Sequence, residues 1–379
     1  MNISYTVKQQ LKKILQVAVL PLIYKAASRS KIQKGKIIFV DGHSEKINAN
    51  MRDLYDRIKS MGYTPMDLCA NYNELGTVAT TRHLIKFMKE YATAEYVFIS
   101  DYYLPIASCK KRHQTKVIQL WHAGGMLKKM GYDASDDLKN EKRISPTRNF
   151  DLVTTSASAC EAVWAQAWHI PVSKVKALGI ARTDKYYNGQ WNKVNVQTFY
   201  RKCPDAYGKK ICIYAPSFEG RASSPHDTGL ESGIFDVFNR LSDEWFVVVK
   251  LHPHMQHIYP QYNFELSSEE LFAVSDMLIT DYSSIIFDYL IYKKPFVLYA
   301  PDLEQYMKNR GFYLDYMSLP APIIRDKEAL YRCMKGDEWK SKSQELDECF
   351  DTYMGACDGH AIDRILYECG LLKEEKNDN

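Results

Sequence analysis

The residues best suited to chemistry follow an apolar stretch near position 280. Met277 to Thr280 has the pattern of a short buried strand, and Asp281, Ser283 and Ser284 come directly after it, before a run of apolar residues at helical spacing. The two serines would lie where a helix begins, beside free backbone N–H groups and the positive end of the helix dipole. This pattern predicts a phosphate-binding turn. A helix cap that binds no ligand has the same sequence, because Asp and Ser are preferred there.

Two more predicted strands end in cationic and polar residues. Residues 117–121 lead into His122 and two glycines, and residues 246–249 lead into Lys250 and His252. In open parallel sheets, ligands bind in the crevice beyond the carboxyl ends of the strands. We therefore expect one cleft lined by residues of these segments and of the loop around position 221: His122, Lys128, Lys129, Arg221, Lys250, His252, His254, Asp281, Ser283 and Ser284.

A set this rich in cations suits a diphosphate ligand. Phosphoryl transfer needs an oriented hydroxyl, charge neutralisation on the phosphoryl oxygens and help for the leaving group. A histidine can serve as base toward the hydroxyl or as a cation that binds phosphate. We favour such a role for His122, which stands at a strand end before two glycines.

Metal binding is the competing interpretation for the histidines of residues 252–257 together with Asp281. No third ligand at a standard zinc spacing appears, which argues against it. A structural histidine beneath a loop is the rival interpretation for His254 and the preferred one for His257. The sequence requires no cofactor, and a divalent cation stays open.

The composition is that of a soluble globular protein, with 46% hydrophobic and 25% charged residues. A length of 379 residues suggests two domains. The net charge of +4 is too small to argue for a nucleic-acid partner. Nine scattered cysteines without a C-x-x-C pair argue against a disulfide framework and favour a reducing, cytosolic location.

Strand-like and helix-like segments alternate along the chain, which indicates doubly wound parallel sheets. One series spans residues 37–178, the hydrophilic stretch 182–209 has the pattern of a join, and a second series begins at residue 211. Residues 218–228, rich in Gly, Ser and Pro, are predicted to form a loop. The predicted fold is α/β, with two Rossmann-like domains facing a cleft, like the GT-B glycosyltransferases.

Residues 1–34 are basic, with lysines and arginines beside an apolar stripe at helical spacing and no acid before Asp41. The apolar part is too short to span a bilayer. Two interpretations stay open: an amphipathic helix packed on its own protein, and a helix lying on an anionic membrane surface.

Seven short motifs follow one another along the chain: 119–129 (QLWHAGGMLKK), 178–184 (LGIARTD), 214–218 (YAPSF), 250–254 (KLHPH), 280–284 (TDYSS), 302–306 (DLEQY) and 310–316 (RGFYLDY). Together they resemble the motifs of the CDP-glycerol glycerophosphotransferases of teichoic acid synthesis. Each motif is short, but the combination is specific and keeps the family's order over about residues 96–316. The single-module length resembles the priming branch, which adds the first glycerol phosphate to a lipid-linked disaccharide.

The resemblance implies roles for individual residues. His122 would be the catalytic base, and His252 would stabilise the donor diphosphate. One position departs from the family pattern, because Glu219 stands where an arginine is usual, so Arg221 is the candidate replacement and CDP-ribitol stays open as donor. The implied donor-phosphate contacts are Arg221, Lys250, Asp281, Ser283 and Ser284, and the further site residues are Gly124, Gly125, Lys128, Arg182, His254 and Glu304.

The implied reaction moves glycerol phosphate from CDP-glycerol to a hydroxyl of a polyprenyl-diphosphate-linked saccharide and releases CMP, at the cytoplasmic face of the cell membrane. Residues 35–205 would form the acceptor domain and residues 206–372 the CDP-donor domain. A sugar transferase of the same fold and a catalytically silent, membrane-docked nucleotide-binding module are the competing hypotheses.

Overall fold

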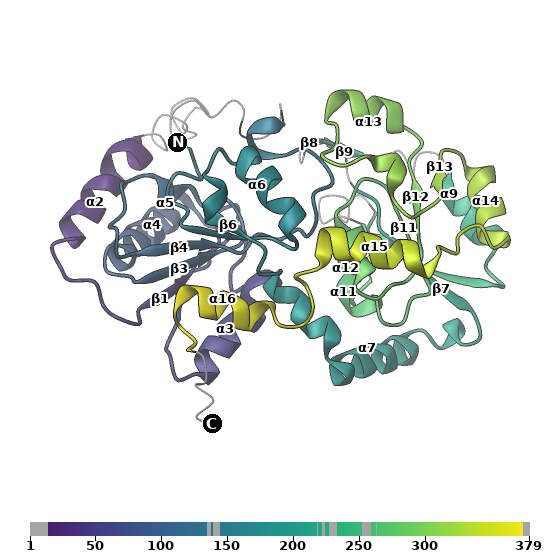
Figure 1. Ribbon diagram of the computed structural model, residues 1–379, viewed down its shortest axis with the longest axis horizontal. Helices are drawn as coiled ribbons and strands as arrows, with labels where there is room; N and C mark the ends of the chain where they lie inside the picture. The colour runs from purple at the N-terminus through teal and green to yellow at the C-terminus, as the bar shows by residue number, and fades with distance from the viewer. Residues whose placement is uncertain are drawn as a thin grey trace.

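The computed structural model describes residues 14–134, 138, 145–217, 219–221, 224–226, 233–251, 259–262 and 264–373, with only the backbone at 219–221 and 224–226. Two large parallel β-sheets occupy separate lobes of the molecule (Figure 1). The predicted α/β fold with two Rossmann-like halves is confirmed.

The first sheet has six strands, all paired in parallel. Successive side chains of a strand point to opposite faces. Ile38 and Val97 therefore pack into the core on one face, and Phe39 and Phe98 pack into the core on the other. In sheet order the strands are β2 (Met66–Asp67), β1 (Ile37–Phe39), β3 (Tyr96–Ile99), β4 (Lys116–Gln119), β5 (Leu152–Thr154) and β6 (Val175–Lys176).

Helices cover both faces of this sheet. Residues of α2 (Leu20–Ala27) and α4 (Thr77–Tyr91) belong to one core, and residues of α3 (Ala49–Ser60) belong to the other. Asn48 fixes the start of α3, because its side-chain oxygen accepts a hydrogen bond from the N–H of Asn50. The remaining helical segments of this lobe are η1 (Leu15–Val19), α5 (Leu104–Ala107), η2 (Gly131–Asp133), η4 (Ser158–Cys160), α6 (Glu161–Ala167), η5 (Val172–Lys174) and η6 (Ala181–Tyr187).

The second sheet has five parallel strands, in the order β10 (Trp245–Val249), β7 (Lys210–Tyr214), β11 (Met277–Thr280), β12 (Phe296–Tyr299) and β13 (Ile323–Ile324). Its helical segments are η7 (Pro204–Ala206), α9 (Ile234–Arg240), η8 (Pro260–Tyr262), α11 (Ser268–Leu271), α12 (Ile285–Leu290), α13 (Leu303–Asn309), η9 (Tyr316–Ser318), α14 (Lys327–Lys335) and α15 (Ser343–Met354).

The segment that the sequence predicts to be a loop contains a short antiparallel hairpin. Its strands are β8 (Glu219–Arg221) and β9 (Ser224–His226), with Gly220 opposite Pro225. Backbone pairing forms this hairpin without the apolar alternation by which strands are recognised in a sequence.

Two helices, α7 (Gly189–Lys202) and α16 (Ala361–Cys369), pack on a lobe other than the one to which the expected domain limits assign them. The hydrophilic stretch after residue 182 is largely helical, and Phe199 of α7 packs against Phe246 in the second lobe. At the other end of the chain, α16 returns to the first lobe and adds Ile365 to the core that contains α3. Figure 1 shows α16, in yellow, beside α3.

The amino-terminal helix α2 packs along one face. Leu20 and Tyr24 are buried, and the Tyr24 hydroxyl accepts a hydrogen bond from the N–H of Arg112. Away from this face, Val17 is 54% and Leu22 is 66% exposed. None of the helices in the described part of the chain is long and apolar enough to cross a membrane. All nine cysteines are buried free thiols.

Candidate active site

Each sheet reverses its strand order once, and ligands of such sheets bind at the reversal. In the first sheet it lies between β1 and β3, and in the second between β7 and β11. Asn48 joins the first pair of strand ends, because its Nδ2 donates to Asp41 at 3.2 Å and to the hydroxyl of Ser100 at 2.9 Å. Among the segments chosen from the sequence, His122 and residues 281–284 follow strands of these two sheets, β4 (Lys116–Gln119) and β11 (Met277–Thr280).

His122 lies just beyond β4 at the carboxyl edge of the first sheet, and its side chain is exposed. Its Nδ1 is 3.0 Å from the carbonyl oxygen of Ser100. A carbonyl oxygen can only accept, so Nδ1 carries the proton and Nε2 of the neutral ring keeps its lone pair. A ring held in this state is suited to take a proton from a hydroxyl group.

The backbone before His122 is held in an uncommon conformation. Trp121 has a positive φ of 54°, and its ring stacks on the imidazole with the ring centroids 4.2 Å apart. The backbone N–H of Trp121 donates to Oε1 of Gln119 at 2.9 Å, and Nε2 of Gln119 in turn donates to the carbonyl of Asp101 at 3.1 Å. Such a φ persists only where surrounding contacts impose it. These contacts fix the direction of the imidazole.

The two glycines after His122 allow the lobes to approach each other closely. A Cβ on Gly124 would stand 2.6 Å from Sδ of Met354, and a Cβ on Gly125, where φ is +62°, would overlap the ring of Phe287. The N–H of Gly125 already donates to the Ser156 hydroxyl at 2.8 Å. The contacts of both glycines are therefore those of packing residues.

At the edge of the second sheet, Asp281 ties two strand ends together. Its carboxylate accepts hydrogen bonds from the Ser217 N–H at 2.8 Å and from the Ser217 hydroxyl at 2.7 Å. Burial raises the pKa of Asp281, while these hydrogen bonds and the charge of Lys128 act in the opposite direction. A carboxylate repels phosphate, so Asp281 is placed to position the Ser217 loop.

Ser283 and Ser284 precede α12 as expected, but that helix has only six residues. The Ser283 hydroxyl accepts a long hydrogen bond, 3.4 Å, from the N–H of Ile285. Ser284 makes no side-chain capping bond. The Ser283 contact is of the kind that a helix cap makes, so a cap without a ligand stays the alternative, and phosphate binding by both serines stays a prediction.

Among the other donor-side candidates, Lys250 donates through Nζ to the carbonyl of Phe264 at 2.6 Å, and burial lowers its pKa. His252 and His254 lie outside the described residues, as does His257, and Arg221 is described only by its backbone in β8. Their roles stay predictions.

The loop that follows the glycines binds to the second lobe. Lys128 pairs with Phe312 in an isolated antiparallel bridge, and the N–H of Lys129 donates to the carbonyl of Gly311 at 3.1 Å. Lys128 also lies close enough to Asp281 to act on its pKa. The loop thus carries a cation from the His122 side to the edge of the second sheet.

Arg182 is buried, and its guanidinium joins the lobes. Nη2 donates to the carbonyl of His122 at 3.0 Å and to the carboxylate of Asp288 at 2.7 Å, while Nη1 donates to the Tyr186 hydroxyl at 3.0 Å. Burial opposes the charge, but Asp288 and neighbouring groups hold the pKa of Arg182 well above its ordinary value. These partners make Arg182 a positioning residue between the lobes.

Glu304 lies in the first turn of α13, where its exposed side chain pairs with Arg325, and its role as a site residue stays a prediction. Asp288, Ser217 and Ser156 are not among the site residues expected from the sequence. Asp288 carried a signal as an acid within the apolar run of α12, and Ser217 carried one as part of the 214–218 motif.

Comparison with known proteins identifies the family. The sequence profile described as "CDP-Glycerol:Poly(glycerophosphate) glycerophosphotransferase" matches residues 22–368. The chain belongs to this family of transferases.

Among its relatives, the teichoic acid ribitol-phosphate primase of Bacillus spizizenii is 30% identical over 356 residues, which cover 88% of this chain and 90% of that protein. The teichoic acid glycerol-phosphate primase of Bacillus subtilis is 28% identical, with 75% of each chain covered. The solved structure of the wall teichoic acid polymerase TagF superposes with a TM-score of 0.72 at 19% identity, over 97% of this chain and 98% of that one. The predicted GT-B-like fold is thereby confirmed.

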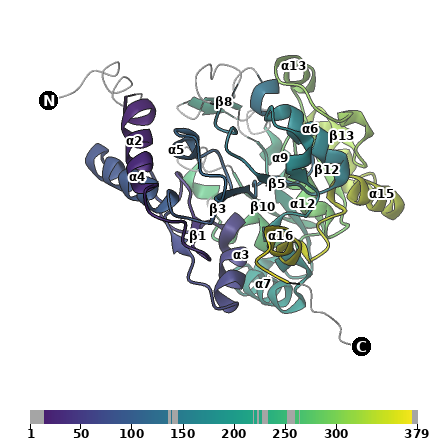
Figure 2. The ribbon, with the colours of Figure 1, turned by 60° about the vertical axis from the view of Figure 1, so that its left-hand side comes forward.

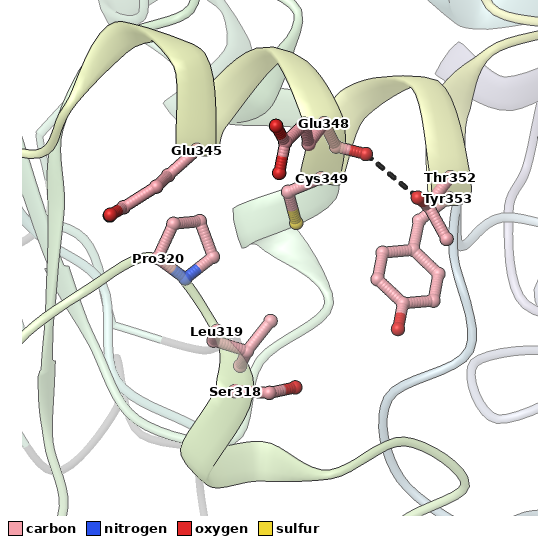
Figure 3. A pocket seen from close by; sticks show the side chains of 8 residues that line it. All are labelled: Ser318, Leu319, Pro320, Glu345, Glu348, Cys349, Thr352 and Tyr353. Carbon is pink, nitrogen blue, oxygen red and sulfur yellow. Dashed lines mark hydrogen bonds between the residues drawn. The ribbon is translucent and has the colours of Figure 1, made fainter.

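This glycerophosphotransferase-family chain also has a pocket of about 410 Å³ between η9 and α15 (Figure 3). Glu345 and Glu348 line it, no cation does, and burial raises the pKa of Cys349 beside them to about 12. The pocket therefore does not suit a diphosphate. Across the described residues, no group of three or more His, Cys, Asp and Glu side chains could hold a metal ion.

Proposed function

We propose that this chain transfers glycerol phosphate from CDP-glycerol to a hydroxyl of a polyprenyl-diphosphate-linked saccharide. His122 carries this proposal, because Nε2 of its neutral ring can accept the hydroxyl proton while the Ser100 carbonyl holds Nδ1. The acceptor oxygen then bonds to the phosphorus that bears glycerol. The bond from that phosphorus to the bridging oxygen breaks, and CMP leaves with that oxygen.

The donor would bind across the edge of the second sheet. We assign the diphosphate to His252, Arg221, Lys250 and the turn at residues 283–284, which follow strands whose carboxyl ends share this edge. Lys128 would add positive charge from the opposite lobe. Neutralising the charge on the phosphoryl oxygens is the main requirement of this chemistry.

The acceptor fixes where such an enzyme works. A polyprenyl diphosphate keeps its saccharide at the membrane surface, so we propose that the protein works on the cytoplasmic face of the cell membrane. Residues 1–34 would contact the membrane, which the exposed Val17 and Leu22 support.

Ribitol phosphate is the second candidate cargo. It is favoured by the 30% identity to a ribitol-phosphate primase. Glu219, at the position where the resembled family usually has arginine, also leaves the donor open. Priming of a chain is favoured over its extension by the extent to which the two primases are covered, 90% and 75%.

Product analysis decides among these functions. Purified protein is given labelled CDP-glycerol, CDP-ribitol or UDP-N-acetylglucosamine with a soluble short-chain saccharide diphosphate, and His122→Asn protein serves as control. We expect CMP and one added glycerol phosphate. Addition of ribitol phosphate or of sugar selects a rival enzyme, and nucleotide binding without any product selects the silent module.

A further inference from the structure

An apolar groove of about 440 Å³ lies between α2, α4 and α5. Figure 2 shows these three helices grouped at one end of the first lobe. The lining contains no charged side chain and includes Leu15, Leu20, Leu84 and Pro105. Ligand sites for apolar molecules have this composition, a mostly apolar wall with a few polar groups.

The rim of the groove is apolar as well. Leu75 and Leu104 line the groove and are 37% and 41% exposed, and Val78, between the lining residues Leu75 and Thr80, is 72% exposed. Contiguous apolar surface of this kind marks sites for lipids or protein partners.

The groove lies near the edge of the first sheet that carries the candidate active site. Leu104 starts α5 four residues after Ser100, whose carbonyl orients His122. Tyr72 lines the groove, and its hydroxyl hydrogen-bonds to that of Tyr103. The backbone N–H of Tyr72 also donates to the carbonyl of Gly42, just beyond β1. The groove wall thus contacts the chain just beyond the carboxyl end of β1, and the neighbouring strand β3 ends just before Ser100, whose carbonyl orients the proposed base.

The inner end of the groove is polar. The Tyr72 hydroxyl lies there, 3.1 Å from Nδ1 of His83. Burial and the charge of Lys86 lower the pKa of His83, whereas the charge of Asp67 acts in the opposite direction. An apolar groove with hydroxyl and imidazole groups at one end suits a hydrocarbon chain that carries a polar head group.

We propose that this groove binds the first isoprene units of the acceptor, next to its diphosphate. The inference rests on the proposed function, which requires an acceptor with its hydroxyl at His122 and a hydrocarbon chain that must leave water. The groove supplies an apolar place for that chain on the same lobe as the base, so the enzyme would recognise the lipid itself.

The test fills the groove with Thr80→Trp, a residue of its α4 wall. The control is Val194→Trp, at an exposed position of α7. Two acceptors share one saccharide diphosphate and carry either a C20 prenyl chain or a short water-soluble alkyl chain. We expect Thr80→Trp to raise KM for the prenyl acceptor about tenfold or more. The KM values for the short acceptor and for CDP-glycerol should not change, nor should any value of the control.

Binding of a fluorescent C20 prenyl diphosphate is measured alongside, independently of turnover. Equal binding by wild-type and Thr80→Trp protein overturns the groove proposal, as does loss of self-association in the variant, which would make a second copy the occupant. If Thr80→Trp does not fold, Leu104→Ser takes its place. Wild-type protein that binds the prenyl probe but transfers nothing to either acceptor overturns the proposed function alone.

Discussion

His122 owes its tautomer to one carbonyl oxygen, that of Ser100, which accepts the Nδ1–H. The stacked ring of Trp121 and the backbone around it also hold the imidazole in place. The position of the His122 side chain allows its catalytic role to be tested separately from the stability of the fold. The imidazole is exposed, so its removal should not disturb the core.

We expect His122→Ala to lower kcat by about 10²–10⁴, the usual contribution of a general base, and to leave the melting temperature unchanged. His113→Ala, which removes another exposed histidine, is the matched control for both measurements. A loss of less than about tenfold in the folded variant would exclude His122 as the base.

At the scale of elements, the glycine loop shows how backbone conformation and packing combine. Gly62 and Gly125 both have positive φ, 88° and 62°, but a Cβ on Gly62 would meet nothing within 4 Å. We expect Gly62→Ala to cost only the backbone term, about 1–2 kcal/mol in the free energy of unfolding. Gly125→Ala should cost more and lower kcat, because Phe287 or the His122 loop must move.

Urea unfolding of both variants measures the difference in the free energy of unfolding. An equal loss of unfolding free energy in both variants would mean that Phe287 moves aside without cost. Close packing of the loop on α12 would then not contribute to stability.

The amino-terminal helical segment has one packed and one exposed face, and each face suits one of the two interpretations of residues 1–34. One face packs through Leu20 and Tyr24, which favours the packed-helix interpretation, while Val17 and Leu22 remain exposed. We expect Leu20→Ala to lower the free energy of unfolding by about 2–5 kcal/mol. The double variant Val17→Gln/Leu22→Gln should keep its stability and sediment less with anionic vesicles.

Sedimentation of the double variant that matches the wild-type value would assign membrane contact to another surface. Each basic residue near an anionic leaflet contributes about 1 kcal/mol, so Lys25→Gln is a useful third substitution for separating charge from apolar contact.

At the scale of the whole molecule, the buried pair of Arg182 and Asp288 couples the lobes. The side chains are 5% and 8% exposed, and Oδ1 of Asp288 has no hydrogen-bond partner among the described residues. Arg182→Leu leaves that carboxylate buried and unpaired, which should cost about 3–5 kcal/mol of stability. Arg240→Leu breaks an exposed pair with Glu328 and should cost far less stability, because solvent screens exposed pairs.

The double variant Arg182→Leu/Asp288→Leu separates positioning from stability. Removing both charges should restore much of the stability, yet kcat should stay low, because the carbonyl of His122 still lacks its donor. Recovery of kcat along with stability would show that Arg182 matters only for folding.

Local patterns in the sequence were sufficient for the strands that carry the site. The apolar run before Asp281 and the run before His122 are both buried strands, because side-chain alternation and strand-end residues are properties of a few neighbouring positions. The two-lobed α/β fold followed from the repeated alternation of such segments. The family followed from seven short motifs in one order.

Only the tertiary structure decided which residues meet. The strand order, the packing of α7 on the second lobe and the return of α16 to the first rest on contacts between distant residues, which no local pattern records. The roles of Asp281 and Arg182 depend on partners 64 and 106 positions away. The sequence marks Gly124 and Gly125 as further site residues, and only the tertiary structure shows that Met354 and Phe287 pack against them. A residue type and its spacing state what chemistry is available, whereas burial and neighbours determine which of it is used.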